Sequence, residues 1–430
     1  MPRWPGRLMI DGLFLVLVGV QISEGIATGG LALTVAGALA DAWYRRRSLD
    51  WASFFTRWRW LVAFAVWAVF APFFALHAPS GTGVGRLFDW LALPAMLRAF
   101  QIADERQRRH LLWAGAVTLV ASALVAGLQH FGAFPDQLTM RRWNILGWNT
   151  DRVYEPVRGA FTRVAGLIVC REIPTRFMAG GLAFHRLVFS DVSCLGILFG
   201  VAVAMRETGW RRLLAMSIAA FALVAIVAFA YVRAGPAAVL GGAAVVMLLG
   251  STNRRRALAV IGGTFLLVLA LVVLIRPVRA RFASSLTFAG SGDRPAIWET
   301  ATHALETSPV VGIGLWRFRV GDWVPPSGPA LLQGFGGKAH DQFLTFAVET
   351  GIPGALLFIL WLLSLGARLD PSTQGGAFGW GALAYFALLS LVHDPLFHAT
   401  FSMAFVLALA WALASGSRKA ARLTRPAPSA

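Results

Sequence analysis

Long apolar runs recur along the whole chain, and they constrain its fold more than any other feature. They are about 17–25 residues long, which is the length that an α-helix needs to cross a bilayer. A mean hydropathy of +0.64 and a hydrophobic content of 57% over 430 residues exclude a soluble globular chain. We therefore expect an all-α polytopic membrane protein with a single integral membrane domain spanning residues 1–430.

The apolar pattern predicts about twelve transmembrane helices, of which the fourth is short enough to be re-entrant. They are expected at residues 8–22, 26–43, 60–77, 87–100, 110–131, 187–205, 211–230, 234–250, 257–276, 342–366, 377–393 and 396–414.

The basic residues predict how these spans are oriented. The net charge is +18, and almost every cation is an arginine, because only Lys338 and Lys419 are lysines. An excess of cations could indicate nucleic-acid binding, but in a membrane protein it is the bias expected of cytoplasmic loops. We therefore predict no nucleic-acid partner. Short basic connectors lie at alternate positions between spans, at residues 44–59, 98–110, 206–212 and 251–256. We assign them and both termini to the cytoplasm, with residues 415–430 as a basic tail at the anionic inner leaflet.

Two long loops, residues 132–186 and 277–341, then face the opposite side, and both are rich in arginine. Long loops cross a membrane regardless of their charge, so this does not contradict the topology. Any single arginine here could be a solvated loop charge paired with a nearby acid. As a set, however, they outnumber the acids, and guanidinium forks suit phosphate. The pattern favours an outward-facing site for a phosphorylated, lipid-linked ligand.

The stretch from Arg294 to Gly354 has the most distinctive chemistry in the chain. Arg294 and Trp298 are spaced i, i+4 behind a helix-starting proline, so they are expected to share one face of a short outer helix. His340 precedes an apolar helix that contains Glu349. A histidine at the outer mouth of a span can remove a proton from a sugar hydroxyl. The alternative is an interfacial structural histidine, which the arginine-rich surroundings disfavour.

Two further arginines lie where spans meet the outer face. Arg233 follows a span in AYVRAGP, and it is either a phosphate contact or an arginine that extends to the interface. Arg186 enters a span beside His185, with Asp191 following. Either Arg186 faces a cavity between helices, or Asp191 forms a structural pair with Arg186 or His185.

The segment LVHDPLFH carries His393, Asp394 and His398 at the same face. No third ligand is evident for a metal, so we interpret this segment as a structural or supporting one. The sequence has no DxD pair, Walker loop, CxxC or GxSxG motif. We therefore expect no metal site and no cofactor.

At these residues the chain resembles the O-antigen ligase/polymerase superfamily of bacterial envelopes, and most closely its lipopolysaccharide O-antigen ligase branch. The matching pattern consists of Arg294 and Trp298, then SPVVGIG from Ser308, HDQFL from His340 and ETGIPG from Glu349, with YVRAG around Arg233 upstream. Two positions depart from the family pattern. Asp341 stands where the family usually has Asn, and Val232 replaces the Ser of its Ser-Arg pair.

The resemblance implies a glycosyltransferase-C-like membrane fold and a glycosyltransferase activity. Such an enzyme transfers undecaprenyl-pyrophosphate-linked polysaccharide to lipid A-core oligosaccharide at the periplasmic face of the bacterial inner membrane. The reaction inverts the anomeric centre and needs no metal. On this interpretation His340 is the catalytic base, and Arg186, Arg233 and Arg294 bind pyrophosphate. The supporting residues are expected to be Trp298, Asp341, Glu349, His185 and His393.

Other functions remain open at this stage. An O-antigen polymerase or a protein O-oligosaccharyltransferase of the same superfamily would differ only in its acceptor, which the sequence does not identify. A lipid-linked oligosaccharide flippase would place charge near the midplane of discontinuous helices, whereas here charge gathers in the outer loops. A non-catalytic envelope scaffold does not account for the polar histidine cluster.

The topology predicts that a cysteine at Gly328, in an otherwise cysteine-free chain, reacts with an impermeant thiol reagent in intact spheroplasts. A cysteine at Ser251, in a basic connector, should react only after lysis, because Lys- and Arg-rich connectors stay in the cytoplasm. The opposite result at the two positions would reverse the assignment.

Overall fold

The fold is described from a computed structural model of the chain. It describes residues 3–46, 50–75, 81–131, 155–164, 167–183, 185–251, 253–276, 278–279, 294–326, 332–333 and 336–423. Much of the two long loops, including residues 132–154, residues 280–293 and Gly328, therefore lies outside the described residues.

Nine helices within this described part are long and apolar enough to cross a membrane. They are α1 (Trp4–Ile22), α2 (Glu24–Tyr44), α3 (Trp51–Phe70), α6 (Glu105–His130), α8 (Arg186–Arg206), α9 (Gly209–Val224, continued by a π-helical turn at Ala225–Phe229), α11 (Arg254–Leu274), α14 (Gln342–Gly366) and α16 (Ala399–Leu423). The shorter helices include α4 (Gly81–Leu91), α5 (Leu93–Ile102), α10 (Ala234–Gly250), α13 (Arg294–Thr307) and α15 (Gln374–Ser390). The protein is thus a multi-pass helical membrane protein, as predicted.

Each predicted span falls largely on helical residues, with three differences of detail. The third span, expected at residues 60–77, begins earlier, because α3 starts at Trp51 within the connector expected at residues 44–59. The fourth span, expected at residues 87–100, is divided at Ala92 into α4 and α5, where Pro94 lies in the first turn of α5. The basic tail expected from residue 415 is helical in its first part, because α16 continues to Leu423.

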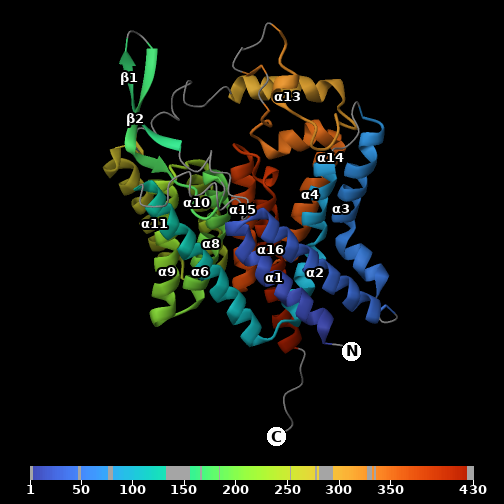
Figure 1. The fold of residues 1–430 in the computed structure, drawn as a ribbon. Helices are drawn as coiled ribbons and strands as arrows, with labels where there is room; N and C mark the ends of the chain where they lie inside the picture. The colour runs from blue at the N-terminus through green and yellow to red at the C-terminus, as the bar shows by residue number, and fades with distance from the viewer. Residues whose placement is uncertain are drawn as a thin grey trace.

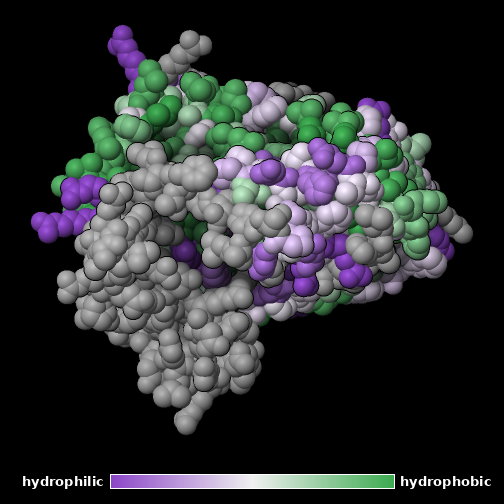
Figure 2. Space-filling view, turned by 90° about the horizontal axis from the view of Figure 1, so that it is seen from above, coloured by the Kyte–Doolittle hydropathy of each residue, from purple (hydrophilic) through white to green (hydrophobic). Residues whose placement is uncertain are grey.

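Figure 1 shows the N-terminus and the C-terminal end of α16 at one end of the helical bundle. The helix α13 and a β-hairpin lie at the other end, which we call the α13 end. Seen from above that end, hydrophilic residues gather over the face while hydrophobic residues lie along much of the rim (Figure 2). This arrangement suits a bundle whose flanks meet lipid and whose ends meet water.

The hairpin is the one described departure from an all-helical chain. Strand β1 (Glu155–Val164) pairs antiparallel with β2 (Leu167–Met178), starting from the pair Val164 and Leu167. The sequence analysis expected an all-α protein and assigned these residues to the first long loop. The correction has a local cause, since both segments mix β-branched and aromatic residues with arginines, a composition that suits a strand.

The chain that leaves the hairpin is fastened to α6. The Gln129 amide oxygen accepts the Gly180 and Gly181 N–H groups at 3.1 and 2.9 Å, and the Ser122 hydroxyl accepts the Leu182 N–H at 3.0 Å. Gln129 and Ser122 are buried, so these bonds satisfy backbone donors that have no access to water. They fix the point at which the chain turns into α8.

An aromatic cluster joins α3, α4 and α14. Phe346 packs against Phe358 with ring centroids 4.5 Å apart, and Trp90 lies 5.5 Å from Phe346 and 6.3 Å from Trp361. Phe64 of α3 lies 5.6 Å from Trp90. These large buried rings hold α14 rigidly within the bundle.

A segment of the second long loop packs against a break in α14. Gly351 adopts φ 73° and ψ 169° inside the helix and is followed by Pro353. The released backbone groups find partners there, since Ile352 N–H donates to Pro309 O at 2.8 Å and Gly314 N–H donates to Glu349 O at 3.1 Å. The two glycine-rich motifs singled out in the sequence, around Gly312 and Gly351, are therefore packed against each other.

We predict that Gly351→Ala destabilises the protein by roughly 2 kcal/mol or more, because only glycine adopts this backbone conformation readily. A Cβ at this position would also overlap the carbonyl oxygen of Val310. The measurement is thermal unfolding of the detergent-purified protein. Gly262→Ala in α11 is the matched control, since no atom lies within 4 Å of its Cβ position. Equal melting temperatures for the two variants would contradict the prediction.

Candidate active site

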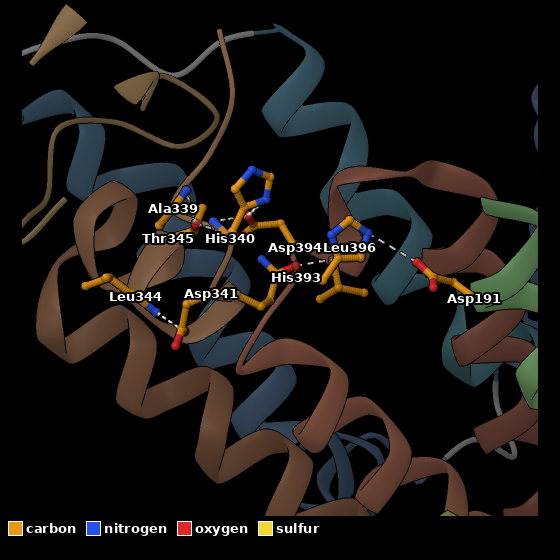
Figure 3. A network of polar contacts seen from close by, with 10 residues as sticks. Asp191, Ala339, His340, Asp341, Leu344, Thr345, His393, Asp394 and Leu396 are labelled. Atoms are coloured by element: carbon orange, nitrogen blue, oxygen red, sulfur yellow. Dashed lines mark hydrogen bonds and ion pairs between the residues drawn. The ribbon is translucent and has the colours of Figure 1, made fainter. Parts of the chain in front are cut away.

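His340 lies between the second long loop and α14, in a left-handed backbone conformation with φ 54°. The next residue, Asp341, caps α14 by accepting the Leu344 N–H at 2.9 Å. A non-glycine residue in this conformation costs on the order of 1–3 kcal/mol and persists only where its surroundings hold it. The surroundings of His340 provide such a hold (Figure 3).

The buried carboxylate of Asp394 fixes this segment. It accepts the His340 N–H at 2.6 Å and the Thr345 hydroxyl at 2.7 Å, and its Oδ2 lies 4.0 Å from Nδ1 of the His340 ring. Close by, the Gln342 amide oxygen accepts the Leu396 N–H at 2.9 Å. The start of α14 is thereby attached to the loop between α15 and α16 (Figure 3).

The sequence analysis predicted His340 but did not place Asp394 among the site residues. The available signal was an aspartate between His393 and Pro395 in a short loop at the expected outer face. Nothing in the local sequence indicated that its carboxylate would reach the backbone of a residue 54 positions away.

The electrostatic environment keeps His340 neutral. Burial lowers the pKa of His340 to about 4, and the positive charges of His393 and Arg294 contribute in the same direction. Burial also raises the pKa of Asp394 to about 6, although its hydrogen bond from Thr345 and the charge of His393 oppose this. At neutral pH the imidazole of His340 is therefore unprotonated and can act as a base.

A second polar pair lies deeper, between helices. Nε2 of His393 lies 3.3 Å from Oδ2 of Asp191, a buried residue of α8 (Figure 3). Burial lowers the pKa of His393, but its interactions with the carboxylates of Asp191 and Asp394 together outweigh that effect, so the net shift is upward. The sequence analysis suggested Arg186 or His185 as the partner of Asp191, whereas the structure pairs it with His393.

Histidine rings connect these groups across the α13 end. The rings of His340 and His393 lie 6.5 Å apart, those of His393 and His398 6.2 Å, and those of His398 and His185 6.2 Å. His185 precedes α8, where its Nδ1 accepts the Leu187 N–H at 3.3 Å. This places Arg186, the first residue of α8, at the far end of the histidine series.

Arg294 begins α13, and its positive charge lowers the pKa of both His340 and His393. Its side chain is half-buried, and burial lowers the pKa of its own guanidinium. No acid among the described residues forms an ion pair with Arg294. By contrast, Arg86 lies 3.2 Å from Glu24 and is therefore neutralised.

Arg233 precedes α10, which packs against α8. The contact is close, since a Cβ on Gly235 would overlap the hydroxyl of Ser190, the neighbour of Asp191. The three predicted arginines thus belong to the N-terminal ends of α8, α10 and α13, and His340 precedes α14. Helix N-termini carry partial positive charge, so this part of the molecule favours an anion.

Two of the predicted supporting residues, Trp298 and Glu349, do not belong to the histidine cluster. Trp298 lies one turn further along α13 and is exposed. Glu349 is fully buried and binds Nζ of Lys338 at 2.5 Å and the Phe318 N–H at 3.2 Å, so it stabilises the loop rather than the histidine cluster. Lys338, one of the cations of the second loop, is consequently engaged in a buried ion pair.

We predict that Asp394→Ala destabilises the protein by about 1–3 kcal/mol, because the His340 N–H and the Thr345 hydroxyl lose their acceptor. Asp394→Asn should cost less, since its amide oxygen can still accept one of the two bonds. Thermal unfolding of purified variants is the measurement, with the exposed Asp322→Ala as control. If Asp394→Ala unfolded at the same temperature as the control, Asp394 would not be what holds this segment.

Comparison with known proteins agrees with the sequence and the geometry. No curated protein matches the chain. Residues 218–359 match the family model described as O-antigen ligase. The matched segment contains Arg233, Arg294 and His340 and ends before the loop that carries His393 and Asp394. The resemblance to the O-antigen ligase superfamily found from the sequence motifs is thereby confirmed over residues 218–359.

Proposed function

We propose that the protein is an O-antigen ligase of the bacterial inner membrane. It would transfer polysaccharide from undecaprenyl pyrophosphate to a hydroxyl group of lipid A-core oligosaccharide, with the α13 end facing the periplasm. One observation carries the proposal: the pKa of a neutral imidazole, His340, is lowered by the charge of a half-buried arginine, Arg294, which no described acid neutralises.

The proposed reaction is a single displacement. The acceptor hydroxyl attacks the anomeric carbon of the donor sugar and loses its proton to the His340 imidazole. The anomeric C–O bond breaks at the same time, and its electron pair leaves with undecaprenyl pyrophosphate. A single displacement inverts the anomeric centre. The imidazolium that forms lies close to the Asp394 carboxylate, which would stabilise it.

The arginines would supply the charge that the leaving group requires. Negative charge builds up on the pyrophosphate as the bond breaks, and guanidinium groups can neutralise it without a divalent cation. Arg294 has the best support, because its charge lowers the pKa of His340. Arg186 and Arg233 begin or precede neighbouring helices at the same end, which suits further phosphate contacts.

A polymerase or a protein O-oligosaccharyltransferase would use the same groups with a different acceptor. The decisive assay offers the purified protein a lipid-pyrophosphate donor with labelled glycan and three acceptors: lipid A-core, a glycan on the same lipid, and an acceptor protein. Label transferred to lipid A-core supports the ligase. Label found only on the lipid-linked glycan would instead indicate a polymerase, and label found only on the acceptor protein would indicate a protein O-oligosaccharyltransferase.

His340→Ala should lower the transfer rate by about 10²–10⁴-fold and leave donor binding intact, because a general base contributes to the chemical step rather than to binding. Donor binding and transfer are measured on the same purified samples. His303→Ala is the matched control, since His303 lies exposed on α13.

His340→Asn provides a second test that is less open to misfolding. Asparagine tolerates positive φ better than alanine, but its amide cannot act as the base. Transfer at the wild-type rate by His340→Asn would show that His340 is a structural residue and that another group takes the proton.

Arg294→Lys should weaken donor binding and slow transfer by roughly ten-fold or more, because an ammonium group cannot reproduce the paired hydrogen bonds of a guanidinium with phosphate. The same assay in the presence of a chelator should proceed at the unchelated rate. Loss of activity on chelation that magnesium or manganese restores would contradict the proposed role of the arginines.

A further inference from the structure

A cavity of about 870 Å³ lies at the end of the bundle opposite the α13 end. It is bounded by the start of α1, the end of α2 and the start of α6, close to the N-terminus marked in Figure 1. None of the residues proposed for transfer lines it. Its role is therefore separate from the proposed reaction.

The mouth of this cavity combines basic residues with aromatic rings. Arg3, Arg7 and His110 line it, together with Trp4 and Tyr44. Trp4 and Tyr44 are about half exposed, and their rings meet edge to face at 6.3 Å. Rings with a polar edge collect at the depth of lipid headgroups, which places the mouth at the membrane interface.

The deeper lining is apolar. Ile10, Phe14 and Leu111 contribute to it, and Phe14 is 44% exposed although it lies inside a predicted span. From Arg3 to Phe14 the cavity follows α1 for three helical turns, or about 16 Å at 1.5 Å per residue. Such a depth exceeds what a phosphate group occupies.

The charges around the mouth leave a positive excess. The cavity is also lined by Asp41, but that carboxylate already binds two arginines, Arg45 and Arg98, which neutralise it. Asp11 lies 3.8 Å from Arg7, and both side chains are largely exposed, so this ion pair is weak. Arg3 and Arg7 are thus available to an anion.

We propose that this cavity binds an anionic phospholipid. Its phosphate would lie between Arg3 and Arg7, and the upper part of one acyl chain would lie against Ile10, Phe14 and Leu111. The volume falls within the range of small-molecule sites, and basic pockets between membrane helices are suited to anionic headgroups. A free phosphate would use the arginines alone and leave the apolar part of the cavity without a role.

The experiment measures lipid binding to the purified, delipidated full-length protein by native mass spectrometry. Phosphatidylglycerol and phosphatidylcholine with identical acyl chains are compared, and glycerol 3-phosphate is the soluble probe. We expect phosphatidylglycerol to bind at least ten-fold more tightly than either of the others. Equal binding of the two lipids would overturn the proposal. Tight binding of glycerol 3-phosphate would also overturn it, because the ligand would then be a soluble phosphate compound and not a lipid.

Two variants locate the binding in the cavity. The double variant Arg3→Ala/Arg7→Ala should weaken phosphatidylglycerol binding by on the order of ten-fold or more, since each basic residue near an anionic lipid contributes appreciably. Arg57→Ala/Arg59→Ala removes the same charge from exposed positions on α3 and should leave binding unchanged. Ile10→Trp keeps both arginines but fills the cavity, so it should also reduce binding. If Arg57→Ala/Arg59→Ala lost as much affinity as Arg3→Ala/Arg7→Ala, the lipid would not occupy this cavity. The same would follow if both Arg3→Ala/Arg7→Ala and Ile10→Trp bound phosphatidylglycerol normally.

Discussion

The buried carboxylate of Asp394 is the interaction on which the candidate site depends most. A carboxylate in a water-poor environment is costly unless donors satisfy it, and here a backbone N–H and a hydroxyl do so. The two donors belong to the segment that enters α14, so the same bonds that satisfy Asp394 also hold His340 at positive φ. The strain of that backbone conformation and the cost of burying the acid are offset by one shared network.

The second loop is attached to α14 by a similar exchange further along the helix. Breaking α14 at Gly351 frees carbonyl and N–H groups, and the segment from Pro309 to Gly314 binds them. Glu349 adds a buried ion pair with Lys338, whose ammonium also lies 5.3 Å from the Trp316 ring. Replacing a buried ion pair by apolar side chains often stabilises a protein, whereas removing one partner costs several kcal/mol. We interpret this pair as fixing where the loop docks rather than as a large net source of stability.

Features that depend on local sequence were predicted well, and those that depend on long-range contacts were not. The spans follow from the bilayer thickness, which demands long apolar helices wherever the chain crosses. His340 was identifiable because polar residues at the mouths of such helices are unusual, and Arg294 because it precedes a helix-starting proline and is spaced i, i+4 from Trp298. Asp191 in α8 pairs with His393 in the α15–α16 loop, 202 residues later in the chain, and no local sequence pattern indicates this contact. The same holds for Asp394 with His340, and for Glu349, whose pattern predicted a supporting role but not its lysine partner.

The cations at the α13 end differ in whether they are neutralised, and this difference links binding to chemistry. Lys338 is paired with Glu349, and Arg86 with Glu24 and Asp89, so neither is available to a ligand. Arg294 has no such acid among the described residues, and its charge helps to keep His340 unprotonated. Under the proposed function, a pyrophosphate at Arg294 would cancel much of that charge and raise the affinity of His340 for a proton. The base would then be unprotonated before the donor arrives and better able to hold the acceptor's proton once the donor is bound.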